Sequence, residues 1–362
     1  MARGVTKPAA PDAATVIEHA EDADLEVTIF DVGHGNCALV RDGRNCAIVD
    51  AAPGDAVLDE LERVNCEHIE HLIISHSDKD HAGGGPTLLL DDARTIGTVW
   101  FNADGEKGSE IWNRLLRAVW TRKRKGGLEG HQSIHTEISQ TLTCGRAVLE
   151  VAHPSILLAG TGPTGRSSAY GRLTTNAVSV VIRVHLAERP AVLLAADMDR
   201  TALDHIRENG KVLNAPVLVF PHHGGLPGNA DPYEFAVELS ELIQPELVIF
   251  SIKSSRRPAN PDPRIVAGVR QGAPDAHIAC TQLSVHCHGN TSPGSGSHLA
   301  ARVASGKPLG RCCAGTITVG WEPDKLVFDP PLAQHRLFVE TRVGKPLCRA
   351  QPLLPEPRRP RT

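Results

Sequence analysis

Residues 72–85 read LIISHSDKDHAGGG, an apolar strand that runs into a polar, histidine-rich turn and then into three glycines. Four potential metal ligands, His76, Asp78, Asp80 and His81, fall within six residues. A strand that breaks into a tight glycine-rich turn can direct several of these side chains into one pocket. The alternative is a solvated polar loop that caps a helix. So many His and Asp side chains directly after a buried strand favour a metal site instead.

Three later strand ends carry further candidate ligands. His153 follows AVLEVA, Asp197 follows AVLLAA, and His222 and His223 follow APVLVFP. Folds with open sheets place their sites at such strand ends. Taken singly, a histidine there is more often structural, and an aspartate often caps a helix. Taken together with the turn at 76–81, these positions predict one site.

Short apolar runs and amphipathic stretches alternate in blocks along the chain. Strands are expected at 26–32, 36–40, 45–49, 71–75, 98–102, 147–152, 177–184, 191–196, 216–220, 246–251 and 315–320. Helices are expected at 55–64, 109–122, 200–209, 232–243 and 262–270. Strands in blocks with helices between the blocks predict an α/β fold with two sheets packed face to face and helices outside.

The organisation predicts one folded domain. A loose, polar lead-in is expected at residues 1–24, the domain at 25–345, and a Pro/Arg-rich tail at 346–362. Two Gly/Ser-rich loops, 159–172 and 288–309, are expected to shape access to the site.

Composition excludes several classes of protein. Of the 362 residues, 41 % are hydrophobic and 22 % charged, which is ordinary for a globular protein and excludes a coiled coil or a wholly disordered chain. The net charge of −4 excludes bulk basicity as a route to nucleic acid, although a local basic patch remains open. No apolar stretch approaches the roughly 20 residues that span a bilayer. The first residues lack a secretory signal. We therefore expect a cytoplasmic protein without a membrane partner.

On these motifs the sequence resembles the metallo-β-lactamase fold, an αββα sandwich. More closely, it resembles the soluble hydrolase domain of the competence protein ComEC and its free-standing relatives. The strings that carry the resemblance are FDVGHGNCALV, IVDAA, ISHSDKDHAGG, TNAVSVVIRV, LLAADM and VFPHHGG, over about residues 26–225, with a weaker similarity to about residue 320. Most of the superfamily has histidine where this chain has Asp78, and aspartate there is similar to the ComEC type.

The resemblance implies a ligand set for two ions. His76, Asp78 and His153 would hold the first ion. Asp80, His81 and one histidine of the 222/223 pair, preferably His222, would hold the second, and Asp197 would bridge the two ions.

The resemblance also implies supporting residues. Asp31 and Asp50 match acidic positions near the floor of such sites, and we expect them to assist catalysis by orienting ligands or main chain. Asn176 and Ser179 are expected to line the pocket and to meet substrate, although most such residues in strands are merely structural.

Three departures from the ComEC pattern stand out. His34 and Asn36 occupy positions where ComEC-type proteins usually show Gln and Asp, so the rim of the pocket differs. Asn260 occupies a place near the active site where a histidine is common, and is a candidate substrate contact. The given sequence shows no membrane channel like that of full-length ComEC, so we expect that it is not the DNA-uptake pore itself.

This ligand set suits hydrolysis. Two divalent ions about 3.5–4 Å apart share one hydroxide and stabilise an oxyanion, with Asp80 and Asp197 among the catalytic carboxylates. Histidine-rich sites favour zinc, whereas Asp78 makes the site richer in oxygen and keeps manganese open. A phosphodiester, and therefore a nuclease or phosphodiesterase activity, fits this chemistry best, with DNA as a possible substrate.

The sequence leaves other hypotheses for the function and for two further motifs. The same site could hydrolyse a small ester, lactone or thioester, or the chain could be a metal-binding effector within a multi-protein defence or DNA-processing system. The basic run at residues 121–125 could bind a phosphate backbone, although a solvated helix end explains it as well. Cys280, Cys287, Cys312 and Cys313 could hold a structural zinc, but buried thiols packed as small hydrophobes are favoured.

Overall fold

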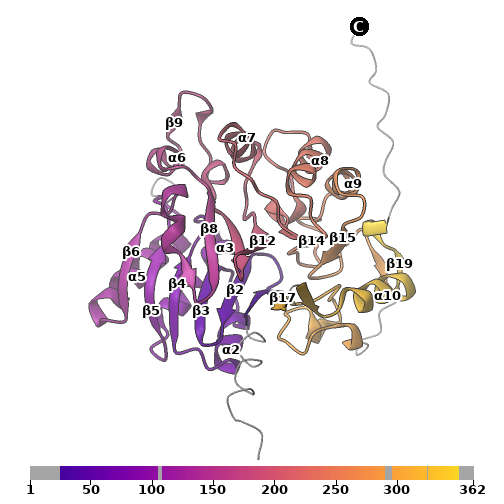
Figure 1. Ribbon diagram of the computed structural model, residues 1–362, viewed down its shortest axis with the longest axis horizontal. Helices are drawn as coiled ribbons and strands as arrows, with labels where there is room; N and C mark the ends of the chain where they lie inside the picture. The colour runs from indigo at the N-terminus through magenta and orange to yellow at the C-terminus, as the bar shows by residue number, and fades with distance from the viewer. Residues whose placement is uncertain (1–24, 105–107, 290–295, 324, 350–362) are drawn as a thin grey trace, which may run out of the picture.

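The structure is a computed structural model and describes residues 25–104, 108–289, 296–323 and 325–349. Two mixed β-sheets face each other and helices cover their outer faces (Figure 1). This is the αββα sandwich that the sequence predicts. The expected lead-in at 1–24 and most of the expected tail at 346–362 lie outside the described residues.

The first sheet has eight strands in the order β18-β17-β1-β2-β3-β4-β5-β6. Their bounds are β1 Leu25–Ile29, β2 Cys37–Asp42, β3 Asn45–Ala51, β4 His68–Ile73, β5 Thr95–Trp100, β6 Leu128–Gln132, β17 Ile317–Glu322 and β18 Lys325–Asp329. The helices on or beside this sheet are α2 Ala56–Arg63, α3 Lys79–Ala82, α4 Gly85–Leu90 and α5 Glu110–Lys125.

The second sheet has seven strands in the order β15-β14-β13-β12-β11-β8-β7. Their bounds are β7 Thr143–Cys144, β8 Ala147–His153, β11 Val181–Leu186, β12 Arg189–Leu194, β13 Val217–Val219, β14 Leu247–Phe250 and β15 His277–Cys280. The helices on its outer face are α7 Arg200–Glu208, α8 Pro232–Ile243 and α9 Pro263–Gly272.

Smaller elements connect or extend the sandwich. They are α6 Ile156–Thr161, α10 Leu332–Arg342, the strand pair β9 Arg166–Ser167 and β10 Gly171–Arg172, and the strand pair β16 His288–Gly289 and β19 Val343–Lys345. Short 3₁₀ turns are η4 Thr136–Thr141, η5 Asn176–Val178, η6 Pro221–Gly224, η7 Gly296–His298, η8 Lys307–Leu309 and η9 Leu347–Arg349. No helix among the described residues is long and apolar enough to cross a membrane.

The strands are apolar on both faces because each sheet is covered on both sides. In β12, Val192 and Leu194 pack between the two sheets, whereas Leu193 packs against the helices of the second sheet. In β3, likewise, Val49 packs between the two sheets and Ile48 packs against α2 and α5. Strands buried on both faces read as continuous apolar runs, which explains why short aliphatic blocks dominate the sequence.

The chain direction of the strands determines where the polar strand ends meet. β1, β3, β4 and β5 run in one direction in the first sheet. In the second sheet β8, β12, β13 and β14 also share one direction. The carboxyl ends in each sheet therefore lie at one edge. A hydrogen bond from the Val180 amide to the Ser75 carbonyl joins the two sheets there.

Several elements differ from the sequence expectation. The strand expected at 177–184 begins only at Val181, because Asn176–Val178 form a 3₁₀ turn. The helix expected to end near residue 122 extends to Lys125 and ends at Gly126, whose left-handed conformation suits glycine. The loop at 159–172 contains the end of α6 and the β9–β10 hairpin. The loop at 288–309 lies partly outside the described residues.

Candidate metal centre

The polar residues after β4 lie partly before the short helix α3 and partly within it. His76 lies in a bend before α3, and Asp80 and His81 lie in that helix. The glycines that follow permit close backbone contact with the end of β3. The Gly84 amide donates to the Ala51 carbonyl at 2.6 Å, and a Cβ on Gly84 would lie only 2.5 Å from the Ala52 carbonyl oxygen. A side chain at position 84 would therefore displace the turn.

His76, His81 and Asp197 form the first of two compact groups, which we call the inner group. His81 Nε2 lies 3.1 Å from Asp197 Oδ1, and His76 Nε2 lies 3.7 Å from Asp197 Oδ2. The three side chains are 2 %, 0 % and 7 % exposed for His76, His81 and Asp197. The inner group is therefore buried.

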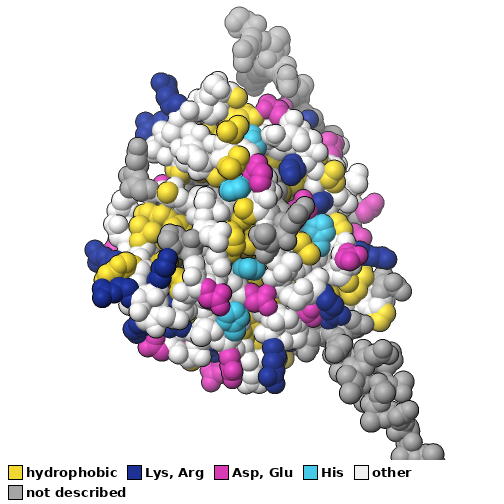
Figure 2. All heavy atoms as spheres, turned by 60° about the vertical axis from the view of Figure 1, so that its left-hand side comes forward, with side chains coloured by type: hydrophobic (Ala, Val, Ile, Leu, Met, Phe, Trp, Pro, Cys, Tyr) yellow, Lys and Arg dark blue, Asp and Glu magenta, His cyan; other side chains and the backbone are white. Residues whose placement is uncertain are grey.

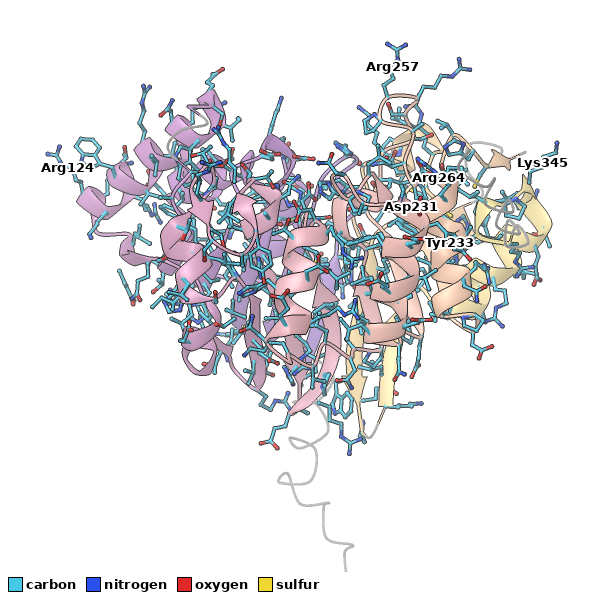
Figure 3. All side chains as sticks on the ribbon, turned by 90° about the horizontal axis from the view of Figure 1, so that it is seen from above. Arg124, Asp231, Tyr233, Arg257, Arg264 and Lys345 are labelled. Atoms are coloured by element: carbon cyan, nitrogen blue, oxygen red, sulfur yellow. The ribbon has the colours of Figure 1, made fainter. Side chains whose placement is uncertain are left out.

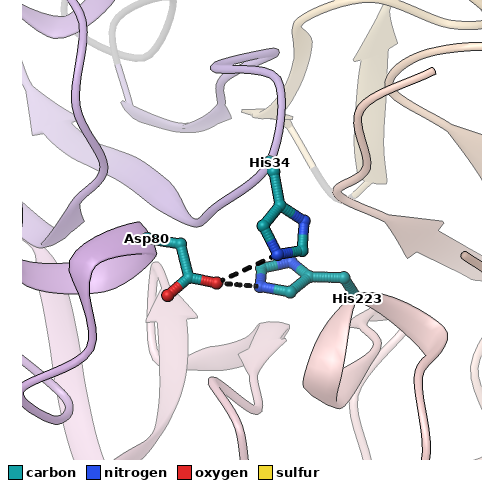
Figure 4. A group of neighbouring side chains, drawn as sticks. All are labelled: His34, Asp80 and His223. Atoms are coloured by element: carbon teal, nitrogen blue, oxygen red, sulfur yellow. Dashed lines mark ion pairs between the residues drawn. The ribbon is translucent and has the colours of Figure 1, made fainter. Parts of the chain in front are cut away.

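His34, Asp80 and His223 form the second group, which we call the outer group (Figure 4). Asp80 Oδ2 lies 3.2 Å from His34 Nε2 and 3.3 Å from His223 Nε2. The imidazole centroids of His34 and His223 are 4.5 Å apart. The side chains of His34 and Asp80 are 34 % and 24 % exposed, so this group has a solvent-facing side.

Asp197 lies between the two groups. Besides its inner-group contacts, its Oδ1 lies 3.8 Å from His223 Nε2 and its Oδ2 lies 3.4 Å from His222 Nδ1. This position suits a carboxylate shared by two ions. Of the histidine pair after β13, His223 belongs to the outer group, whereas His222 Nε2 lies 3.2 Å from the amide nitrogen of Asn176. Both histidines of the pair therefore lie beside the carboxylates, His223 in the outer group and His222 next to Asp197, and the preference for His222 stays a prediction.

The grouping differs in part from the expected ligand sets. His81 belongs to the inner group with His76 and not to the group that contains Asp80. Asp78 Oδ2 lies 3.8 Å from His76 Nε2, beside the inner group. His153 is fully buried and its Nε2 contacts the Ala177 carbonyl at 3.0 Å, so it lies outside both compact groups.

Asp50 contacts His81 of the inner group on the side of the imidazole away from Asp197. Its Oδ2 lies 2.7 Å from His81 Nδ1, and its carboxylate accepts hydrogen bonds from the amide and the hydroxyl of Ser75. A carboxylate on Nδ1 fixes the imidazole so that Nε2 faces the site, which is the usual arrangement behind histidine ligands.

Asp31 lies elsewhere. Its buried carboxylate accepts from the Gly33 and Gly306 amides, from Gln282 and from Ser305. Among the described residues it contacts no member of either group, so its hydrogen bonds support a structural rather than a catalytic role.

The three expected substrate contacts also occupy different places. Ser179 is completely buried; its hydroxyl lies 3.3 Å from His76 Nδ1 and accepts from the Asp197 amide. Its hydroxyl is therefore placed against His76 and the Asp197 amide and not toward solvent. Asn176 and Asn260 are partly exposed beside His222, where the Asn260 amide donates to the His222 carbonyl at 3.4 Å.

Charge and burial together determine the protonation of these groups. Burial opposes a charge on His81, but Asp197 and Asp50 outweigh it and raise the pKa of the imidazole well above its ordinary value. Burial likewise opposes ionisation of Asp197, yet His81 and its neighbours hold the pKa of that carboxyl well below its usual range. Burial also opposes ionisation of Asp80, but the His223 and His34 imidazoles beside its carboxylate outweigh it and lower the pKa. Burial lowers the pKa of His153 to about 3.

The backbone is strained around the site. Asp50, Ala196, His222 and His223 all have positive φ, at 58°, 46°, 53° and 55°. Non-glycine residues in this conformation cost on the order of 1–3 kcal/mol each and persist where the surroundings force them, most often at functional sites. The strain here coincides with the ends of β3, β12 and β13.

The donor set fits divalent ions. His81 Nε2, His223 Nε2, His153 Nδ1 and Asp197 Oδ1 are buried atoms without a well-formed hydrogen bond in the described part of the chain. Leaving such atoms unsatisfied costs about 1–3 kcal/mol each. Imidazole nitrogens and carboxylate oxygens are ligands for zinc and similar metals, and a bound cation would satisfy them. The two groups are therefore consistent with a dinuclear metal site.

Sequence reasoning missed two contributors. His34 was expected only at the rim, yet it belongs to the outer group. Gly35 explains its position: a Cβ there would lie 2.3 Å from the Asp80 carbonyl oxygen, so the loop after β1 lies directly on α3. The second is Asp104, whose buried carboxylate accepts from Ser77 and from Thr175, joining the metal-binding turn to η5.

The late cysteines do not form a comparable site. Burial raises the pKa of Cys280 well above its ordinary value and also raises that of Cys313. Within the described residues, only the inner and outer groups bring three potential ligand atoms close together. The geometry therefore agrees with buried thiols packed as small hydrophobes.

Comparison with known proteins finds a family similarity in the first half of the chain. Residues 30–161 match the family model of the metallo-beta-lactamase superfamily. A search of curated protein sequences returned no significant match.

Several solved structures are similar at low sequence identity. Igni18, described as a novel metallo hydrolase from Ignicoccus hospitalis, is 15 % identical; the match covers 70 % of this chain and 94 % of that chain, with a TM-score of 0.42. The metallo-beta-lactamase fold protein YhfI from Bacillus subtilis is 11 % identical, with 70 % and 96 % covered and a TM-score of 0.43. Zn(2+)-bound PqqB from Methylobacterium extorquens is 12 % identical, with 54 % and 72 % covered and a TM-score of 0.34. Residues 30–161 are therefore similar to the metallo-beta-lactamase superfamily, and the whole described chain forms an αββα sandwich with His/Asp groups at its strand ends.

Proposed function

We propose that this protein is a dinuclear metal-dependent hydrolase that acts on phosphodiesters. The observation that carries the proposal is the pairing of a buried inner group with a solvent-facing outer group through Asp197. A buried group retains its ion, while the exposed side of the outer group leaves room for a substrate.

Each residue has a distinct task in this proposal. His76, His81 and Asp197 hold one ion, and His34, Asp80 and His223 hold the other. Asp50 and Ser179 keep the inner imidazoles in place through the contacts described above. When bound, two such ions would lower the pKa of water and polarise a phosphoryl oxygen. Zinc suits the four imidazoles of the two groups, and manganese remains the alternative because of the carboxylates.

A cationic loop beside the outer group supports an anionic substrate. The loop between β14 and α9 carries Lys253, Arg256 and Arg257, and none of the three forms an ion pair with a described residue. The Lys253 side chain lies beside Gly33, where a Cβ would be 3.9 Å from it, next to His34. Arg257 projects outward from the molecule (Figure 3). Guanidinium and ammonium groups at the rim favour phosphate oxygens.

The basic end of α5 contributes less than its sequence suggests. The Arg122 side chain is only 4 % exposed and pairs with Asp92, and Arg124 lies over the Trp120 ring. On the face shown in Figure 2, the Lys and Arg side chains are scattered among acidic ones. The choice of DNA as the phosphodiester therefore depends on the ComEC resemblance and on the rim loop.

The first experiment measures metal content and hydrolysis together. Wild-type protein, reconstituted with zinc or manganese, should hold about two equivalents by elemental analysis. It should also hydrolyse bis(p-nitrophenyl) phosphate. An Asp80→Ala/His81→Ala variant should lose most of the metal and the activity. The matched control, Asp59→Ala/His68→Ala, removes an exposed Asp and an exposed His and should keep both.

The outcome separates the competing functions. Turnover of p-nitrophenyl acetate or a lactone without turnover of the phosphodiester would replace the proposal with an esterase or lactonase. Two bound ions without turnover of any of these compounds, or of plasmid and single-stranded DNA, would favour a metal-binding effector that needs a protein partner. Less than about half an equivalent of metal after reconstitution would contradict the metal centre itself.

A further inference from the structure

A cavity of about 710 Å³ lies outside the elements that carry the inner and outer groups. It is bounded by the carboxyl end of α9, the edge strand β15, the helix α10 and the 3₁₀ turn η9. Its volume is in the usual range for a site that binds a small organic molecule.

Arginine side chains dominate the polar lining. Arg270, Arg336 and Arg349 line the cavity, against two carboxylates, Asp275 and Glu340. Arg349 is engaged by Glu340, with Nη2 and Oε1 2.6 Å apart. Within the described residues Arg270 and Arg336 form no ion pair, and the buried Nε of Arg270 has no hydrogen-bond partner. Two guanidinium groups therefore remain available to an anion.

The lining also contains neutral and apolar groups. Ile278, Val339 and Cys348 supply apolar surface. His277 is hydrogen-bonded to the buried His335 at 2.8 Å, and His335 in turn contacts the Cys313 thiol at 3.2 Å. Burial, followed by the charges of Arg336, Arg349 and Arg270, lowers the pKa of His277 to about 4. Such suppression agrees with guanidinium groups facing His277 with too few counter-charges.

We propose that this cavity binds a small organic phosphate, with the phosphate dianion between Arg270 and Arg336 and the organic part against Ile278 and Val339. Arginine offers a planar fork of donors that matches phosphate oxygens. Two unpaired guanidinium groups match the charge of a phosphate monoester at neutral pH. The apolar surface and the volume exceed what inorganic phosphate needs, which favours an organic ester.

The test uses AMP as the probe and adenosine as its uncharged counterpart. Calorimetric titration is performed on the full chain after EDTA treatment, so that metal ions in the hydrolytic centre do not bind the phosphate. We expect AMP to bind one site, adenosine to bind at least about tenfold more weakly, and Arg270→Gln/Arg336→Gln to lose at least about tenfold in affinity.

The controls keep the test decisive. Arg264→Gln removes an arginine at the amino end of the same helix, which pairs with Asp262 and does not line the cavity, and should leave AMP binding within about twofold. Should the double variant misfold by circular dichroism, the single Arg336→Gln variant on the exposed face of α10 replaces it. Absence of AMP binding to wild type at millimolar concentration, or equal binding by the arginine variants, would overturn the proposal.

Discussion

Two regions of this molecule are rich in histidine, and their surroundings shift the histidine pKa in opposite directions. In the metal centre, the buried His81 lies between Asp50 and Asp197, which raise its pKa. In the arginine-lined cavity, burial and nearby positive charges lower the pKa of His277 to about 4, and burial and His277 lower that of His335 to about 3. Burial favours the neutral imidazole in both regions. The neighbouring charges reverse that effect in one region and reinforce it in the other.

The comparison shows that partners, and not residue type, determine which ligand a histidine cluster suits. Carboxylates around imidazoles create a site for cations, because a divalent ion replaces the proton. Guanidinium groups around imidazoles create a site for anions. The following predictions test each side of this contrast.

The largest effect is expected from Asp197→Ala. Asp197 contacts members of both groups, so its loss should release both ions and reduce phosphodiester hydrolysis by at least about 10³-fold. Elemental analysis and kinetics measure the two effects. Asp199→Ala is the matched control: Asp199 caps α7 through Thr201 and Ala202, so it should cost about 1 kcal/mol of stability and leave metal content unchanged. Equal metal loss in both variants would contradict a bridging role for Asp197.

A smaller effect is expected from Asp50→Asn, because Asp50 acts through His81. Metal affinity should fall by about 10–100-fold, as is usual when the partner of a histidine ligand is removed. Asp31→Asn is the comparison, since its carboxylate is equally buried but contacts the loop at 304–312 instead. Asp31→Asn should lower the melting temperature but leave the metal affinity unchanged. Competition with a chromophoric chelator measures both affinities, and a greater loss in Asp31→Asn would reverse the assigned roles.

The cavity histidines predict a pH dependence of stability. An unfolded chain protonates histidine near its ordinary pKa of 6.5, whereas folded His277 resists protonation until about pH 4. Below pH 6.5 the unfolded state therefore binds more protons, and the free energy of unfolding falls as the pH drops toward 4.

Metal-free protein isolates this effect from metal loss. Between pH 6.5 and 4, His277→Gln should lose on the order of 2 kcal/mol less stability than wild type, measured by denaturant unfolding. His68→Gln, which removes an exposed histidine, should follow the wild-type slope. A His277→Gln slope equal to wild type would show that this histidine is protonated alike in both states.

The smallest effect is expected from His34→Gln. His34 is the most exposed member of the outer group, and Asp80 and His223 remain in the variant. One of two ions should bind about 10-fold more weakly, at the low end of the range for lost contacts at a metal site, and the other should be unchanged. Cobalt substitution reports the change through the visible spectrum of the weaker site, independently of activity. Identical cobalt spectra and affinities in both proteins would remove His34 from the ligand set.

The sequence predicted the αββα fold because its signals are local. Aliphatic runs mark strands buried on both faces, and His76 to His81 share one turn whose position follows from the end of β4. His34 could not be recognised as a candidate ligand in this way, since it meets Asp80 only after the loop at Gly35 packs on α3.

Residues whose partners lie far along the chain were harder to place. Asp31 gives no local sign that its partners are Gln282, Ser305 and Gly306. The arginine-lined cavity was missed because α10 spreads its apolar residues around the helix and its Arg336 lies at the same cavity as Arg270 only in the folded chain.

The position of β1 has a consequence for how the protein is made. This strand pairs with β17, and the Asp31 carboxylate that ends it is hydrogen-bonded by residues beyond position 280. During synthesis the ribosome releases β1 nearly three hundred residues before β17. The edge of β1 that pairs with β17 therefore stays unpaired until β17 has been synthesised. Completion of the first sheet, and with it the anchoring of the loop that carries His34, therefore requires residues that are translated long after that loop, and this long-range pairing slows the step.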